Sequence, residues 1–201
     1  MTDLDTLRAR FERSAAVPDR FFAVEAPAVA RACQAAARRF LQGGRLLVFG
    51  EGAEASDAQH VAVEFVHPVI VGKRALPALA LTADTAALTG ASRGGPVAFA
   101  PILAALGHPA DIALGISRGA PGPAVREGLA AARARGLLTI ALAGGAADRD
   151  AADFVFVVPG DDPLVVQEVQ ETLYHVLWEL VHVFVEHEQA GAEPGGEAPG
   201  G

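Results

Sequence analysis

The sequence predicts a doubly wound α/β fold with a five-stranded parallel sheet flanked by helices. Five short apolar runs lie between turn-rich and helical segments. None of the runs alternates strictly between apolar and polar residues, which is typical of strands that are covered on both faces. Strands of this kind, alternating with helices, build an open parallel sheet. The runs occupy residues 46–49, 78–81, 112–116, 138–142 and 154–158.

Two helices are expected before the first strand and one long helix after the last strand. Residues 4–16 read as a short amphipathic helix, and residues 21–41 as a longer one that ends before Gly43-Gly44. The last element, from about residue 164 to 188, carries apolar residues on more than one stripe. We expect one side of it to pack on the sheet and another to meet a second subunit.

One domain accounts for most of the 201 residues, of which 51% are hydrophobic. We expect residues 1–188 to form it, with N-terminal helices over residues 1–42 and the α/β core over residues 45–188. Residues 189–201 contain mainly Gly, Pro, Ala and Glu. This segment has too few apolar side chains to offset its ordering entropy, so a disordered tail is expected.

Composition excludes several classes of partner. The formal net charge of -8 and the scattered Lys and Arg residues argue against binding of nucleic acid. The single cysteine, Cys33, excludes disulfides within the chain and fits a reducing compartment. A signal peptide and a membrane-spanning apolar run are both lacking in the sequence, so we expect a cytoplasmic protein without a membrane partner.

Four polar side chains on two predicted helices are candidates for chemistry. His60 and Glu64 are spaced i, i+4 and therefore share one helical face. This pair suits a divalent ion or acid–base catalysis, although the same spacing is common in solvated helix pairs. Gln167 and His175 are eight residues apart, about 12 Å along a helix axis, so they need other elements to share one ion.

The turns after the first and third strands are the expected place for a ligand, because an open parallel sheet binds ligands beyond the carboxyl ends of its strands. Glycines in residues 50–54 and 117–122 allow backbone N–H groups to approach an oxyanion. Glu51 and Glu54 place carboxylates in the first turn, whereas Arg118 places a cation in the second. Alternatively, the two glutamates only stabilise the N-terminus of the following helix.

Together these motifs resemble the sugar isomerase (SIS) domain family, specifically its sedoheptulose-7-phosphate (phosphoheptose) isomerase branch. The similarity spans most of residues 20–187. The similar segments are Gly50-x-Gly52, Asp57-Ala58-x-His60-x-x-x-Glu64, Leu76-Pro-Ala-Leu-Ala-Leu81, Leu114-Gly-Ile-Ser117, and Gln167-Glu168 followed by His175.

The resemblance implies a function and a site. His60, Glu64, Gln167 and His175 match the residues that hold a divalent metal in that branch, with zinc, one per subunit, as the expected ion. Glu64 matches the catalytic base and His175 the catalytic acid of aldose–ketose interconversion. The resemblance also implies a sugar or sugar-phosphate substrate and a homotetramer with its sites between subunits.

The sequence departs from the branch where substrate binds. Residues 50–54 are Gly-Glu-Gly-Ala-Glu, where the family has Gly-Asn-Gly-Gly-Ser. Residues 117–122 are Ser-Arg-Gly-Ala-Pro-Gly, where the family has a hydroxyl-rich phosphate turn. Residues 91–93 are Ala-Ser-Arg, where the family has Gly-Asn-Asp. Two functions therefore stay open: an isomerase with an altered substrate, in which Arg118 or Arg93 replaces lost phosphate donors, or a non-catalytic sugar-binding or scaffold module. The expected substrate-binding residues are Glu51, Gly52, Ala53, Ser92, Arg93, Ser117, Arg118 and Gln167.

Overall fold

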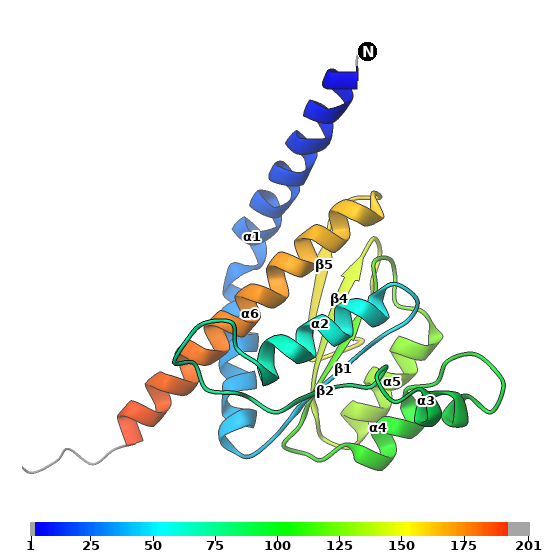
Figure 1. The fold of residues 1–201 in the computed structure, drawn as a ribbon, viewed down its shortest axis with the longest axis vertical. Helices are drawn as coiled ribbons and strands as arrows, with labels where there is room; N and C mark the ends of the chain where they lie inside the picture. The colour runs from blue at the N-terminus through cyan, green and yellow to red at the C-terminus, as the bar shows by residue number, and fades with distance from the viewer. Residues whose placement is uncertain (1–2, 193–201) are drawn as a thin grey trace, which may run out of the picture.

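The computed structural model describes residues 3–192 and contains a sheet of five parallel strands in the order β2-β1-β3-β4-β5 (Figure 1). Each strand coincides with one of the five apolar runs, so the predicted fold class is confirmed. The strands are β1 (Leu46–Gly50), β2 (Ala78–Ala80), β3 (Ile112–Ile116), β4 (Leu138–Gly144) and β5 (Phe154–Val158).

Helices cover both faces of the sheet, as a doubly wound fold requires. Alternate residues of β1 point to opposite sides: Leu46 and Val48 pack with α1, α2 and α6, whereas Leu47 and Phe49 pack with α4 and α5. Both layers are therefore buried, which explains why the strands lack apolar/polar alternation. The helices are α1 (Asp3–Leu41), α2 (Glu54–Val66), α3 (Thr85–Ser92), α4 (Ala100–Leu106), α5 (Pro123–Ala134) and α6 (Pro163–Ala192).

The expected pair of N-terminal helices is wrong, because α1 is one continuous helix that contains Pro18 and Pro27. A proline in a helix interior costs about 3 kcal/mol. Val17 and Phe21, on either side of Pro18, are both buried in the core. Burying two such side chains contributes about 3–6 kcal/mol, which is enough to keep this segment helical.

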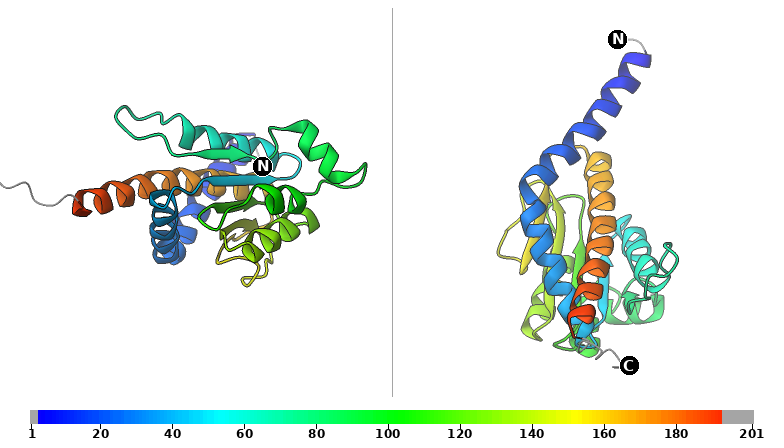
Figure 2. Two further views of the ribbon diagram at one scale, coloured as in Figure 1. Left: turned by 90° about the horizontal axis from the view of Figure 1, so that it is seen from below. Right: turned by 90° about the vertical axis from the view of Figure 1, so that its left-hand side faces the viewer.

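The last helix, α6, extends four residues beyond its predicted end, to Ala192. The rest of the predicted tail, residues 193–201, lies outside the described residues. Along its length α6 runs beside α1 (Figures 1 and 2), and the two helices share one core cluster with the sheet. Part of the apolar surface of α6 therefore packs on α1. That another side of α6 meets a second subunit stays a prediction. Among the described residues, no helix has the length and apolar character to span a membrane.

Candidate active site

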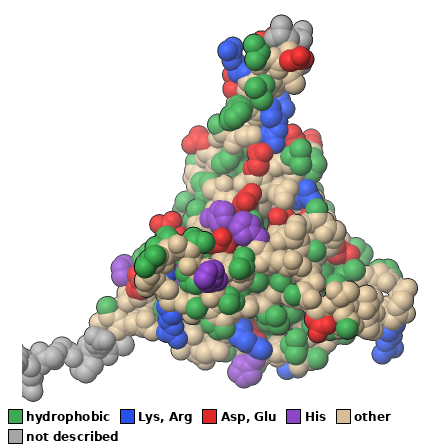
Figure 3. All heavy atoms as spheres, viewed as in Figure 1, with side chains coloured by type: hydrophobic (Ala, Val, Ile, Leu, Met, Phe, Trp, Pro, Cys, Tyr) green, Lys and Arg blue, Asp and Glu red, His purple; other side chains and the backbone are tan. Residues whose placement is uncertain are grey.

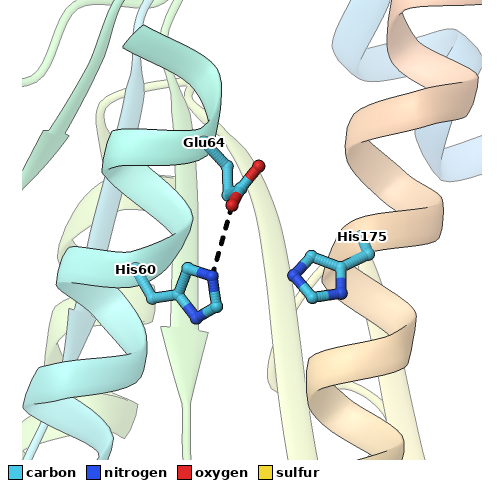
Figure 4. Close-up of side chains that lie close together, drawn as sticks. All are labelled: His60, Glu64 and His175. Atoms are coloured by element: carbon cyan, nitrogen blue, oxygen red, sulfur yellow. Dashed lines mark hydrogen bonds and ion pairs between the residues drawn. The ribbon is translucent and has the colours of Figure 1, made fainter. Parts of the chain in front are cut away.

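His60, Glu64 and His175 form a cluster between α2 and α6 (Figure 4). One nitrogen or oxygen atom from each of the three lies within 4.8 Å of the others. Nε2 of His60 lies 3.3 Å from Oε1 of Glu64, and the rings of His60 and His175 are 5.3 Å apart. The prediction that His60 and Glu64 share one face of a helix is thus confirmed, and His175 on α6 lies next to that face.

The packing of α2 explains why these side chains face α6. Ala58, Val61 and Phe65 are buried against the sheet, so His60 and Glu64 lie on the neighbouring face of the helix. The two helices are also tied together directly. The indole Nε1 of Trp178 on α6 donates a hydrogen bond of 2.8 Å to the backbone oxygen of Glu64. The position of the Glu64 backbone is therefore fixed relative to α6.

Tyr174 contacts the cluster, a role that the sequence analysis missed. Its hydroxyl oxygen lies 3.0 Å from Nδ1 of His60, and its side chain is buried. Burial raises the pKa of Tyr174, and the charges of Glu171, Asp57 and Glu64 raise it further, so the hydroxyl stays protonated at neutral pH. Tyr174 lies among apolar residues of α6, so the sequence pattern indicates a packing role for its ring. Its position next to His175 was the one feature of the sequence that pointed to a place in the site.

The donor set of this cluster fits a divalent metal. Two imidazole nitrogens and one carboxylate oxygen are the protein ligands of many catalytic zinc sites, which keep one position open for substrate or water. If His60 binds through Nε2, its Nδ1 must carry the proton and donate to the oxygen of Tyr174. Tyr174 would then orient the imidazole ring from the side opposite the ion.

Gln167 lies in a second network, with Arg118, Asp57 and Glu54. Its Nε2 donates to Oδ1 and Oδ2 of Asp57 at 3.0 and 3.3 Å, and its Oε1 accepts from Nη1 of Arg118 at 3.2 Å. Both ends of the Gln167 amide are therefore engaged away from the three-residue cluster. Nε of Arg118 in turn donates to Oε1 of Glu54 at 2.7 Å.

The two turns meet at the carboxyl edge of the sheet, as expected. Residues 51–53 connect β1 to α2, and Gly52 has a φ of 61°, a conformation that glycine favours. Ser117 follows β3; its backbone N–H donates to Leu142 O, and its backbone oxygen accepts from Gln170 Nε2. The predicted ligand-binding turns after β1 and β3 thus lie beside each other, joined by the Glu54–Arg118 ion pair.

Ser92 and Arg93 end α3 and lie outside both networks. The Ser92 hydroxyl donates to Leu88 O within its own helix, and Arg93 caps the helix in the left-handed region with a φ of 48°. In the described part of the chain, neither side chain forms a hydrogen bond or ion pair with the His60 cluster or with the Arg118 network.

Charge around the cluster is mainly acidic. In Figure 3, His side chains lie together with acidic ones near the middle of the face formed by α2 and α6. His175 is exposed, whereas the side chain of Glu64 keeps only 16% of its accessible surface. The cluster is therefore open to solvent on the α6 side and closed around the carboxylate.

Comparisons of the sequence and of the structure with known proteins point to the same family. A family model described as the SIS domain matches residues 11–144. A phosphoheptose isomerase from Solidesulfovibrio magneticus is 40% identical over 173 residues, 85% of this chain and 85% of the relative. One from Thermodesulfovibrio yellowstonii is 34% identical over 181 residues, 88% and 90% of the two chains.

Two solved structures of phosphoheptose isomerases superpose on the chain over most of its length. The structure from Francisella tularensis has a TM-score of 0.81 at 29% identity and covers 91% of this chain and 100% of its own. The structure from Neisseria gonorrhoeae has a TM-score of 0.79 at 27% identity and covers 90% of this chain and 100% of its own.

Proposed function

The chain belongs to the SIS domain family, and from this membership we propose that it is a metal-dependent aldose–ketose isomerase of a sugar or sugar phosphate. The observation that carries the proposal is the convergence of His60, Glu64 and His175 from two helices. The relatives named phosphoheptose isomerase support the reaction class.

Each residue of the cluster has a chemical role in this proposal. Glu64 removes the proton from the carbon next to the substrate carbonyl and returns it to the neighbouring carbon. His175, the exposed member of the cluster, protonates the carbonyl oxygen as the proton leaves carbon and then takes the proton of the neighbouring hydroxyl group, which becomes the new carbonyl; His60 helps to hold the metal. A bound divalent ion, zinc in the first instance, would polarise the substrate oxygens as a Lewis acid.

Gln167 is the fourth proposed ligand, and it would have to exchange its present partners for the ion. Its amide now bonds to Asp57 and Arg118. An amide oxygen is a weaker ligand than an imidazole nitrogen or a carboxylate for zinc. We therefore assign metal binding principally to His60, Glu64 and His175, with Gln167 completing the set when it leaves Arg118.

The substrate contacts belong to the same proposal. Residues Glu51, Gly52 and Ala53, together with Ser117 and Arg118, line the meeting point of the two turns at the carboxyl edge of the sheet. Residues 117–122, the turn after β3, carry a single side-chain hydroxyl group, that of Ser117, so an altered sugar is part of the proposal. Ser92 and Arg93 would contact substrate only from the end of α3.

A non-catalytic sugar-binding module is the second candidate, and the pairing of Arg118 in the turn after β3 is the observation in its favour. Arg118 in this turn is neutralised by Glu54 instead of being offered to a ligand. A module that only binds sugar has no need of a base and an acid beside a set of metal ligands, however. The cluster of Glu64, His60 and His175 therefore favours the isomerase.

The proposal includes a homotetramer, and the surface of α1 supports association. Leu4, Leu7 and Phe11 are 75%, 56% and 70% exposed on the part of α1 that projects beyond the sheet (Figure 1). Large apolar side chains exposed together on one helix are typical of an interface with another subunit. We assign this surface of α1 to subunit contact, beside the side of α6 predicted from the sequence.

A cytoplasmic location also belongs to the proposal. The only cysteine of the chain, Cys33, lies on α1, and its free thiol is buried in the core. A chain that uses its cysteine for packing suits a reducing compartment.

The proposal is tested by measuring metal content and isomerase activity together. The purified protein should contain about one divalent ion per chain and interconvert an aldose–ketose pair, with sugars and sugar phosphates compared as substrates. His60→Ala should lose both the ion and the activity. His187→Ala, which changes an exposed histidine of α6 outside the cluster, serves as the control. Equal metal content in the wild type and His60→Ala would remove the assigned site.

A further inference from the structure

Glu54 occupies the hydrogen-bond donors that the turn after β3 offers to an anion. Its Oε1 accepts from the backbone N–H of Arg118 at 3.2 Å and from Nε of the same residue at 2.7 Å. The side chains of Glu54 and Arg118 keep only 16% and 19% of their accessible surface. This ion pair is thus largely shielded from solvent and is stronger than a surface pair.

We propose that Glu54 is an internal anion that determines specificity, so that the substrate has an uncharged hydroxyl group at this end instead of a phosphate. The proposal rests on the isomerase function given above, because it concerns the far end of the same substrate. It assigns to Glu54 the exclusion of phosphate esters, and to Arg118 the role of holding Glu54 in place.

Without Glu54, the turn would have the features of an anion site. It lies at the carboxyl edge of the sheet, between β3 and the N-terminus of α5, where helix N–H groups favour negative charge. Gly122 precedes α5 and gives it no side-chain cap. The backbone is held in place as well, since Ser117 N–H donates to Leu142 O and Gly144 N–H donates to Gly119 O. The donors are thus preorganised, and one carboxylate takes two of them.

A second carboxylate strengthens the exclusion. A Cβ added to Gly122 would lie 3.1 Å from Oε2 of Glu51, which places the Glu51 carboxylate at the start of α5. A phosphate dianion approaching Arg118 would meet both Glu51 and Glu54. Like charges placed opposite each other in a binding site weaken binding and so reject the wrong partner. A neutral hydroxyl group meets no such repulsion and can donate to either carboxylate.

The Glu54–Arg118 pair is offset from the His60 cluster along both helices. Glu54 precedes His60 by six residues on α2, about 9 Å of helix rise. Arg118 also contacts Gln167, which lies eight residues before His175 on α6, about 12 Å of helix rise. In the proposal, the reacting end of the substrate lies at the His60 cluster and its far end points toward the Glu54–Arg118 pair.

The test is an anion titration of the full-length protein as purified, with inorganic phosphate as the probe and calorimetry as the readout. Glu54→Ala should bind phosphate at least about tenfold more tightly than the wild type, because it frees Arg118 and removes one negative charge. Glu54→Gln, which removes the charge but keeps an acceptor of similar shape, should gain less. Glu51→Gln also removes one charge but leaves Arg118 paired with Glu54, so it should gain less than Glu54→Ala, and Glu54→Ala with Arg118→Ala should lose the gain. Circular dichroism checks that each variant is folded.

A second titration compares sedoheptulose with sedoheptulose 7-phosphate. The wild type should bind the free sugar at least as tightly as the ester, and Glu54→Ala should reverse this order. The inference is overturned if the wild type binds phosphate or the ester as tightly as Glu54→Ala does, or if Glu51→Gln gives the same gain. None of these measurements needs turnover, so a lack of isomerase activity would count against the proposed function alone.

Discussion

The hydroxyl oxygen of Tyr174 lies 3.0 Å from Nδ1 of His60 and joins α6 to α2 beside the candidate metal ligands. Hydrogen bonds from such outer partners fix the orientation and tautomer of a histidine ligand, and their loss typically costs about 10–100-fold in metal affinity. Tyr174→Phe should therefore bind zinc at least about tenfold more weakly in competition with a chromogenic chelator. Unchanged affinity would show that His60 needs no such partner. Thermal unfolding of the metal-free proteins controls for loss of packing.

Glu64→Gln should test the catalytic base, with metal content measured in the same samples because Glu64 is also a proposed metal ligand. The amide cannot accept the substrate proton, so the turnover rate should fall by about 10²–10⁴-fold while the variant stays folded. Glu171→Gln is the matched control, because the Glu171 carboxylate lies 3.9 Å from Nδ1 of His60 but is 46% exposed. The assignment of the base is wrong if both variants lose activity equally, or if Glu64→Gln keeps the wild-type rate.

Asp111 should make the protein sensitive to acid. Burial by itself would raise the pKa of Asp111, but hydrogen bonds from Arg45 and from the His108 N–H outweigh burial and hold it below its usual value. The ionised Asp111 therefore stabilises the fold above its unfolded-state pKa of about 3.9, and this contribution is lost as pH falls through the lower folded-state value.

The matching variant is Asp111→Asn, which should lower the free energy of unfolding at pH 7 by about 2–4 kcal/mol. Its loss of stability relative to the wild type should shrink as the pH is lowered towards 3. Denaturant unfolding at a series of pH values measures both effects. Asp161→Asn, an exposed aspartate in the connection before α6, is the control and should change little. If the difference in unfolding free energy between the wild type and Asp111→Asn does not change with pH, the charge of Asp111 is not what stabilises the fold.

Cys33 should be unreactive in the native protein. Burial raises the pKa of its thiol to about 12, so little thiolate is present at pH 8. Labelling with a thiol reagent should be at least about a hundredfold slower in buffer than in denaturant, because the reagent has to wait for local unfolding. Rapid labelling of folded protein would show that α1 opens easily.

Association through α1 should depend on its exposed apolar side chains. The wild type should have the mass of four chains of 20.6 kDa by light scattering. Leu7→Glu combined with Phe11→Glu should reduce that mass, because a buried charge without a partner opposes contact. Val69→Glu combined with Val71→Glu changes two exposed valines of the loop after α2 and serves as the control. If the loop variant dissociates instead, the interface has been assigned to the wrong surface.

The sheet could be predicted from the sequence because its signal is local. Each strand is a short apolar run bounded by turn residues, and the run itself shows burial on both faces. The shared face of His60 and Glu64 follows from helical spacing in the same way. Both predictions are confirmed by the structure.

The features that the sequence missed depend on contacts between distant segments. Whether α1 continues through Pro18 depends on burial of Val17 and Phe21, which no local pattern reveals. The ion pair between Glu54 and Arg118 joins residues 64 positions apart. Its two members were both noticed in the sequence, but their pairing appears only when β1 and β3 lie side by side.

The position of α6 has a consequence for how the protein matures. His60 and Tyr174 are 114 positions apart, and α6 is the last element of the described chain. During synthesis, a nascent chain that ends before α6 has His60 and Glu64 but neither His175 nor the tyrosine that orients His60. The proposed ion would therefore meet its three principal ligands together only after the final helix has docked.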